Sequence, residues 1–222
     1  MRIDYDLIRS RRKTVAIHIR DCHVIVRAPL RYPVREINRF VESKNAWIKK
    51  HLSVQQERAS QARDFKLDYG SDILYLGHTY KIASEEGVQG TFYCPSGLNE
   101  EQIKKKLILF YKERAGEIIP ELIASFAPRL FVKPANVRIG SAKRSWGSCT
   151  SSGRLTFSWR IMMASPEAIE YLVVHELAHL KQLNHSEKFW DVVASVLPDW
   201  KERRKELRLL QDLHTQKQLS AF

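Results

Sequence analysis

Hydrophobic and polar positions along the first part of the chain predict a small sheet and a helix. Residues 14–28 hold two β-branched runs on either side of the turn-like pair Asp21-Cys22, a pattern typical of a β-hairpin. Apolar residues in the range 34–52 then recur every three to four positions after Pro33, and this spacing predicts an amphipathic helix.

The middle of the chain repeats this order of strands and helix. Residues 73–82 predict two short strands around Gly77, and residues 91–94 predict a further strand. Apolar residues return at helical spacing from Asn99 onward, which predicts a long helix. Pro120 is expected to kink or end that helix, because proline lacks a backbone N–H group.

The remaining part of the chain predicts two strands and further helices. Short strands are expected at residues 136–141 and 154–159, the second with one apolar and one polar face. A helix should follow Ser165, which is a suitable N-cap before a proline at the first helical position. The charged segment from residue 200 to about residue 219 predicts an exposed amphipathic helix.

These elements indicate an α+β protein in two unequal parts. A length of 222 residues fits one elaborated domain or two small ones. We expect a β-rich N-terminal subdomain with one helix over residues 1–97. Helices plus a small antiparallel sheet should form the domain over residues 98–222.

Composition favours a globular protein of a reducing compartment. Hydrophobic residues make up 44% of the chain and charged residues 28%, which suffices for a core without disulfide support. The cysteines, Cys22, Cys94 and Cys149, are odd in number and form no CxxC pair. The N-terminus lacks the apolar core of a signal peptide, and no stretch reaches the roughly 18 apolar residues of a membrane span. We therefore expect a cytoplasmic protein without a membrane partner.

The charge balance leaves the partner open. A formal net charge of +12 raises the local concentration of phosphate-bearing molecules, so a nucleotide or a nucleic acid is one candidate partner. The basic residues are dispersed over predicted helices and turns, where solvated charge is the commonest outcome.

Residues 175–179 carry the strongest chemical signal. They read His-Glu-Leu-Ala-His within the helix that follows Ser165. Two histidines four positions apart emerge on one helical face and can chelate one metal ion. In such a motif the imidazoles hold Zn²⁺, and the intervening Glu176 takes a proton from the water that zinc activates.

His185 is the candidate for a third ligand. A catalytic zinc needs three protein ligands and one open position, and His185 can reach the metal if the helix ends after His179. Asn184 suits a helix C-terminus, and Ser186 can cap the next helix. The predicted zinc ligands are therefore His175, His179 and His185, with Glu176 as the general base.

A motif before the polar-faced strand supplies candidates for substrate binding. Residues 144–149 read Arg-Ser-Trp-Gly-Ser-Cys and combine an aromatic ring, a flexible glycine and a thiol. A tight connection between strands would explain the same residues equally well. An edge strand beside a zinc cleft can pair with an extended peptide, and the strands at 136–141 and 154–159 are the candidates. The candidate substrate contacts are Arg144, Trp146, Cys149, Thr156 and Ser158.

Three stretches resemble a known family of metallopeptidases. The similarity is to the YgjP-like metallopeptidase domain. It lies in residues 146–149, in residues 171–180, and in the Asn-His-Ser and Phe-Trp sequences within residues 184–190. SprT-like proteases look like more distant relatives. The resemblance implies a zincin-like metallohydrolase domain with the same three histidines as ligands and Glu176 as the catalytic base.

Three functions are compatible with these residues. The leading hypothesis is a zinc-dependent metallopeptidase acting on a peptide or protein. The second is a metal-dependent hydrolase of nucleotide phosphoanhydrides, in which Arg144, Arg154 and Arg160 would hold phosphate, although no Gly-rich phosphate loop is present. The third is a nucleic-acid-binding module with a structural zinc, although such sites usually have four protein ligands and three are evident here. The oligomeric state is left open.

Overall fold

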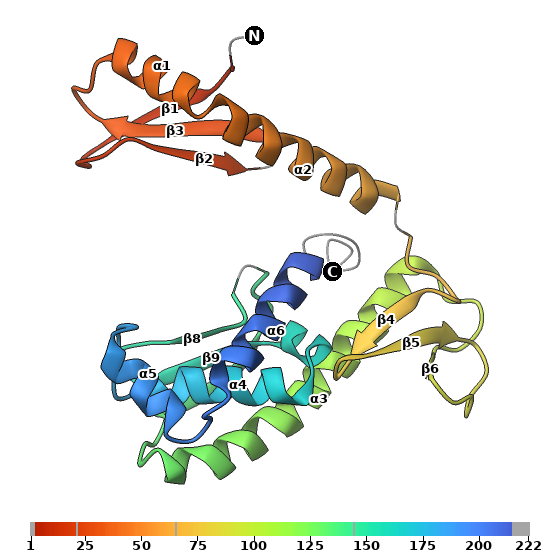
Figure 1. Ribbon diagram of the computed structural model, residues 1–222. Helices are drawn as coiled ribbons and strands as arrows, with labels where there is room; N and C mark the ends of the chain where they lie inside the picture. The colour runs from red at the N-terminus through yellow and green to blue at the C-terminus, as the bar shows by residue number, and fades with distance from the viewer. Residues whose placement is uncertain (1–2, 21, 65, 144, 215–222) are drawn as a thin grey trace. The chain divides into compact units, whose positions relative to one another are not determined.

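The chain folds into two compact units, Met1–Phe65 and Lys66–Phe222 (Figure 1). A computed structural model describes residues 3–20, 22–64, 66–143 and 145–214. Helices and small sheets are both present, so the predicted α+β class is confirmed. Among the described residues, no helix is long and apolar enough to cross a membrane.

The N-terminal unit contains a three-stranded mixed sheet. Its strands are β1 (Asp6–Ser10), β2 (Ala16–Arg20) and β3 (His23–Pro29), in the order β1-β3-β2. β2 and β3 are antiparallel, which confirms the predicted hairpin, whereas β1 lies parallel to β3. The side chain of Gln55, in the helical segment that follows the sheet, binds the turn of the hairpin. It accepts a hydrogen bond from the Cys22 N–H group at 3.1 Å and donates one to the Ile19 carbonyl at 3.1 Å.

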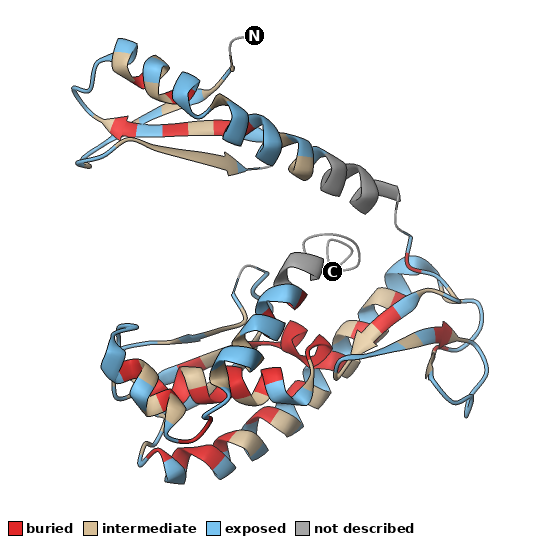
Figure 2. Cartoon of the chain, viewed as in Figure 1, coloured by how far each residue is buried: buried red, intermediate tan, exposed pale blue. Residues whose placement is uncertain are grey.

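Two helices supply the other half of this unit's core. The segment that the sequence predicted as one helix forms α1 (Val34–Ser43) and α2 (Asn45–Asp64), with a break at Lys44. Burial alternates along β3, where every second residue is inside (Figure 2). The buried residues are Val24, Val26 and Ala28 of β3, with Ile37, Val41 and Ile48 of the helices.

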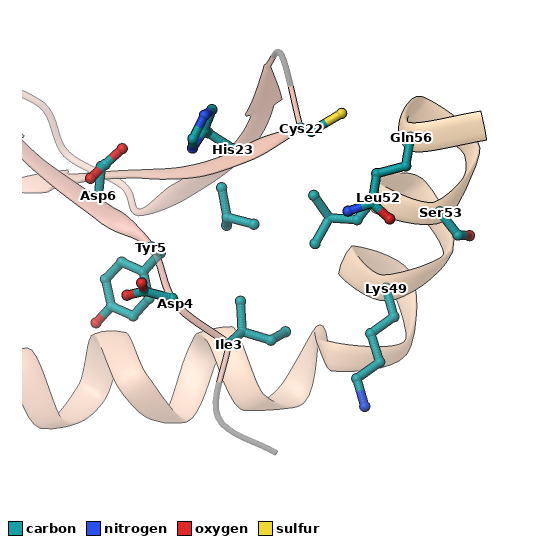
Figure 3. Close-up of a pocket in the computed structure, with 11 residues that line it drawn as sticks. Ile3, Asp4, Tyr5, Asp6, Cys22, His23, Lys49, Leu52, Ser53 and Gln56 are labelled. Carbon is teal, nitrogen blue, oxygen red and sulfur yellow. The ribbon is translucent and has the colours of Figure 1, made fainter. Parts of the chain in front are cut away.

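A pocket of 580 Å³ lies between the start of the chain, β3 and α2 of this unit (Figure 3). Ile3 and Leu52 point into it, whereas Lys49 points away. Ile3 and Leu52 also pack against the core of the unit, so the pocket has an apolar floor. It is a depression over that core, and the histidine cluster that could hold a metal ion, as found among the described residues, lies in the other unit.

The second unit begins with another small mixed sheet. Its strands are β4 (Asp72–Tyr75), β5 (His78–Ala83) and β6 (Thr91–Tyr93), with β4 antiparallel and β6 parallel to β5. The strands expected on both sides of Gly77 are thus confirmed. Gly77 has φ +78°, and a Cβ atom there would lie 3.1 Å from the Cα atom of Ser165, so this turn requires glycine.

This sheet belongs with the residues that follow it. The Leu76 N–H group donates to the Met162 carbonyl at 2.8 Å, and the Tyr111 hydroxyl donates to the Leu74 carbonyl at 2.6 Å. The two units consequently divide between residues 65 and 66, whereas the sequence pattern suggested a boundary near residue 97. Strand periodicity shows that a strand has a buried face, but not which segment covers that face.

The long helix α3 (Glu100–Arg129) begins with a capping box between Asn99 and Gln102. Pro120 was expected to kink or end this helix. It does not end the helix, which continues for nine further residues. Pro120 and Gly116 both lie on the exposed face, so water can satisfy the Gly116 carbonyl that proline deprives of a partner. Burial of Ile119 and Ile123 in the adjacent turns offsets the remaining cost.

A third sheet lies against α4 and carries the residues next to the site. Strands β7 (Asn136–Gly140), β8 (Gly147–Cys149) and β9 (Arg154–Ser158) have the order β7-β9-β8. The sheet was expected to be antiparallel, but it is mixed, because β7 runs parallel to β9. The 3-10 helix η1 (Trp159–Met163) follows, and the Trp159 ring stacks on Tyr111 of α3 at 5.6 Å.

Three helices complete the unit: α4 (Pro166–Ala178), α5 (Glu187–Ala194) and α6 (Trp200–His214). The helix expected from residue 200 is confirmed as far as residue 214, and its expected end near residue 219 falls outside the described residues. α4 packs against α3, α5, α6 and β8, so it is the central helix of this unit.

Candidate metal centre

The helix α4 is buried on almost every side, and its histidines mark where it faces the surface. The side chain of Ser165 accepts from the Ala168 N–H group at 3.3 Å, and Pro166 takes the first helical position, as the sequence predicted. Every residue from Tyr171 to Ala178 is buried except His175, which is partly exposed. The imidazoles of this helix therefore lie at the border between core and solvent.

The chain reverses direction directly after α4 and brings a third histidine to the first two. The Gln182 N–H group still bonds to the Ala178 carbonyl at 3.0 Å, and the helix ends there. Asn184 does not adopt the left-handed conformation that asparagine tolerates at helix C-termini; its side chain accepts instead from the Ser186 N–H group at 3.2 Å. His185 thereby returns toward α4, with its Nε2 atom 3.1 Å from Nε2 of His175.

The nitrogen atoms of the three histidines form a compact cluster. One ring nitrogen from each of His175, His179 and His185 lies within 4.8 Å of the others. Two imidazole ligands of a tetrahedral zinc, each about 2.0–2.1 Å from the ion, have their nitrogens about 3.3 Å apart. The 3.1 Å between His175 and His185 is close to that value. The donor set and its spacing fit a metal ion.

The outer nitrogens of two rings already have partners. Nδ1 of His175 lies 3.3 Å from the Tyr171 hydroxyl, and Nδ1 of His179 lies 3.0 Å from the Gln182 carbonyl. A ring whose Nδ1–H group donates to oxygen presents an unprotonated Nε2 atom, which is the form that binds metal. Burial raises the pKa of Tyr171 to about 12, so its hydroxyl stays protonated.

Helix α5 places an aromatic wall behind the cluster. The ring of Phe189 is fully buried and lies 4.6–4.9 Å from the centroids of all three imidazoles. Trp190 stacks on His185 at 5.8 Å. Burial, assisted by the neighbouring histidines, lowers the pKa of His175 to about 3, and burial also lowers that of His185. Both rings are thus held neutral, as metal binding requires.

Glu176 lies beside the histidines in an unusual environment for a carboxylate. It is 4% exposed, and burial raises its pKa to about 8. The backbone of Gly147 in β8 approaches it so closely that a Cβ atom at that position would lie 2.6 Å from Oε1 of Glu176. A carboxyl group with a pKa near neutrality can both accept and release a proton under ordinary conditions.

The structure brings some of the expected substrate-binding residues to this site. Trp146 lines a pocket together with His175 and Glu176. The pKa of Cys149 is raised, mainly by burial and to a lesser extent by the negative charge of Glu176. Arg144 lies outside the described residues.

Thr156 and Ser158 lie on the other face of the sheet. Thr156 is paired with Ser148, and alternate residues of a strand point to opposite faces, so Thr156 points away from the side of Gly147. Ser158 is 2% exposed, and its hydroxyl donates to the Ala142 carbonyl at 2.8 Å. Ser158 therefore fixes the loop before β8, and the structure does not bring either residue to the histidines.

The order of the strands changes which of them could pair with an extended peptide. β9 lies between β7 and β8, so both of its edges are occupied and it cannot add another strand. β7 is an edge of this sheet, but β8 is the edge that lies against Glu176. The alternation of apolar and polar residues in β9 predicted its faces correctly, yet carried no information about its place in the sheet.

Comparison with known proteins places this metal centre in a family. The model of the YgjP-like metallopeptidase domain matches residues 13–209. The chain belongs to the YgjP-like metallopeptidase family. Membership implies a hydrolase with peptide or protein substrates, and the family accounts for both units, since the match begins within the first. No match is found among curated proteins.

Two solved structures are similar to part of this family member. The metallopeptidase zymogen abylysin of Pyrococcus abyssi has 27% identity and a TM-score of 0.39, and the alignment covers 45% of this chain and 99% of that one. The zymogen jannalysin of Methanocaldococcus jannaschii has 22% identity and a TM-score of 0.37, with 43% and 96% covered.

The site also contains residues that the sequence analysis did not select. The pocket next to His175 and Glu176 has a volume of 260 Å³ and is lined on one side by Arg204 and Arg208 of α6. Both belong to the charged C-terminal segment, for which the sequence predicts an exposed amphipathic helix. Their i, i+4 spacing on a helix with an apolar side was the available signal, but it does not say which charged residues face another element.

Proposed function

We propose that this protein is a zinc-dependent metallopeptidase that hydrolyses peptide bonds with Glu176 as general base. The observation that carries the proposal is the cluster of three imidazole nitrogens within 4.8 Å, next to a buried glutamate of the same helix. Three nitrogen ligands leave one position of a tetrahedral zinc open, which suits a catalytic rather than a structural ion.

His175, His179 and His185 would hold the zinc ion, which would serve as a Lewis acid toward the attacking water and the scissile carbonyl. Glu176 accepts a proton from the attacking water at its carboxylate and passes it to the departing amine nitrogen. Tyr171 and the Gln182 carbonyl hold two of the imidazoles in the required orientation. Phe189 and Trp190 exclude water from the rear of the site.

The edge strand β8 is the element best suited to receive an extended peptide. It is three residues long, it borders β9 on one side only, and its Gly147 backbone lies beside Glu176. A peptide added at this edge would bring one of its carbonyl groups close to the histidines by main-chain pairing.

The test combines metal analysis with turnover. Wild-type protein should contain about one zinc per chain, and His185→Ala should lose or weaken this binding, whereas His78→Ala, an exposed histidine of β5, should leave it unchanged. Glu176→Gln should bind zinc normally but hydrolyse an unfolded protein substrate at least about 100-fold more slowly. Full activity of Glu176→Gln would contradict the assignment of the base.

Hydrolysis of nucleotide phosphoanhydrides is the second candidate, and the two arginines near Glu176 are the observation that favours it. Of the arginines first considered for this role, Arg160 is 2% exposed and donates to the Ser141 carbonyl at 2.9 Å, so it is not available to phosphate. A panel of nucleoside triphosphates with phosphate detection decides the matter. Turnover of nucleotides without turnover of any peptide would replace the peptidase proposal.

A further inference from the structure

A pocket with two arginines adjoins the metal centre on the side of α6. Its volume is 260 Å³, and His175, Glu176, Trp146, Arg204 and Arg208 are among the residues that line it. Pockets for drug-sized ligands span roughly 300–1,000 Å³, so this one suits a single side chain or chain end. Whatever enters it lies next to the general base proposed above.

Among the described side chains, none forms an ion pair with the two arginines of this pocket. Arg203, the neighbour of Arg204, bonds to Glu170 at 2.6 Å and to Asp199 at 2.8 Å. Arg204 and Arg208 form no ion pair with any side chain that the structure describes. Two guanidinium groups one helical turn apart therefore face a partly buried space whose described lining contains one carboxyl group, that of Glu176.

Arg204 is held in a fixed position by aromatic rings. Its guanidinium lies 4.7 Å from the centroid of Trp190 and 6.0 Å from that of Trp200. These two indoles stack on each other at 4.2 Å, and Trp190 in turn stacks on His185. Such contacts hold the guanidinium in place before a ligand binds. Binding therefore costs little side-chain entropy. The positive charge of Arg204 lies beside the histidine cluster, since this residue lines the same pocket as His175 and Glu176.

We propose that Arg204 and Arg208 form a carboxylate-binding subsite for the substrate residue that flanks the scissile bond. Planar guanidinium groups bind carboxylates through paired hydrogen bonds, and these are strong in a partly desolvated pocket. The apolar part of the lining, which includes Trp146, accepts the methylene groups of an acidic residue. The carboxylate comes from a glutamate or aspartate side chain or from the C-terminus of the substrate. This inference rests on the proposed peptidase function and specifies its substrate.

The test uses four peptides with the zinc-loaded full chain. They share one sequence and differ in having glutamate or glutamine next to the cleaved bond, and a free or an amidated C-terminus. Wild-type protein should cleave the carboxylate-bearing forms with a kcat/KM about 10- to 100-fold higher, as expected for charge-assisted hydrogen bonds. A preference that survives amidation identifies the side chain as the source, and one that amidation abolishes identifies the terminus.

Variants of α6 assign the preference to the pocket. Arg208 is exposed, so Arg208→Gln should fold normally and cleave the acidic and the neutral peptides at similar rates. Arg208→Glu should shift the preference toward a lysine at the same position. Lys205→Gln removes a positive charge from the same helix at an exposed position that does not line the pocket, and it should retain the wild-type preference. Equal cleavage of all four peptides by wild type, or an unchanged preference in Arg208→Gln, overturns the subsite.

A binding measurement separates this inference from the proposed function. Metal-free protein titrated with N-acetylglutamate should bind it at least about 10-fold more tightly than N-acetylglutamine amide, which carries no carboxylate, and Arg208→Gln should abolish the difference. If no peptide is hydrolysed but this difference is found, the peptidase proposal fails and the carboxylate site stands. If peptides are hydrolysed and no difference is found in binding or turnover, the subsite alone fails.

Discussion

Gly147 and Glu176 are in such close contact that no larger residue than glycine fits at the first of the two positions. A Cβ atom on Gly147 would lie 2.6 Å from Oε1, 2.8 Å from Cγ and 2.9 Å from Cδ of Glu176. The two residues are 29 positions apart in the chain and belong to β8 and α4. A strand backbone thus forms one wall around the proposed general base.

Gly147→Ala should therefore impair hydrolysis while leaving the metal site intact. The new methyl group must displace the carboxylate of Glu176, and a displacement of about 1 Å can cost a factor of about 100 in rate. We expect kcat to fall by about that factor with zinc content unchanged, measured by mass spectrometry and peptide hydrolysis.

Gly116→Ala is the matched control for this substitution. Gly116 lies in the exposed face of α3, and a Cβ atom there would have nothing within 4 Å. This variant should keep full activity and gain up to about 1 kcal/mol of stability, since alanine favours a helix more than glycine does. Equal losses of activity in both variants would show that β8 does not confine Glu176.

Tyr171→Phe should weaken metal binding without removing a ligand. The phenol oxygen lies 3.3 Å from Nδ1 of His175, and outer partners of this kind typically contribute a factor of 10–100 in metal affinity. Competition with a chelating dye measures the change. Tyr5→Phe removes a hydroxyl that bonds to Asn38 in the N-terminal unit and should have no effect on zinc affinity. An unchanged affinity in Tyr171→Phe would contradict the orienting role of this phenol.

Removal of the metal should lower the melting temperature of wild-type protein. An ion bound by the folded chain alone adds RT ln(1 + [L]/Kd) to stability, about 2.7 kcal/mol when the free metal is 100-fold above Kd. Differential scanning calorimetry with and without a chelator measures the shift. His185→Ala should melt at nearly the same temperature in both conditions, because one of its three nitrogens is missing. A similar chelator effect in this variant would place the metal elsewhere.

Glu176→Gln should stabilise the metal-free protein, and more so as the pH rises. Burial raises the pKa of Glu176 from 4.5 to about 8, so the folded protein holds a proton that the unfolded chain releases. The contribution of this carboxyl is fully present below pH 4.5 and is lost between about pH 4.5 and pH 8. Glutamine has no such loss, and the difference at pH 8 should be on the order of 4 kcal/mol. Thermal melts of both proteins at pH 5 and pH 8 measure it, and a difference independent of pH would refute the effect of burial.

The histidine motif shows how far local sequence can define a site. His175 and His179 share a helical face because of the 3.6-residue repeat, and Ser165 and Pro166 define where that helix begins. The place of His185 could be inferred as well, since it follows a helix end by a few residues and has little freedom to lie elsewhere. These relationships are set by covalent geometry and short segments, so the sequence by itself determined them.

Other features depended on contacts between distant segments, and only the tertiary structure decided them. Strand periodicity predicted β9 with its two faces, but the order β7-β9-β8 made β8 the edge beside Glu176. The apolar positions of α6 predicted a helix with a buried side, whereas its packing against α4 brought Arg204 and Arg208 to the metal centre. A periodic pattern specifies which face of an element is buried but not its partner, because burial of apolar surface is non-directional. The cluster of three histidines could thus be predicted from the sequence, whereas the residues that surround it could not.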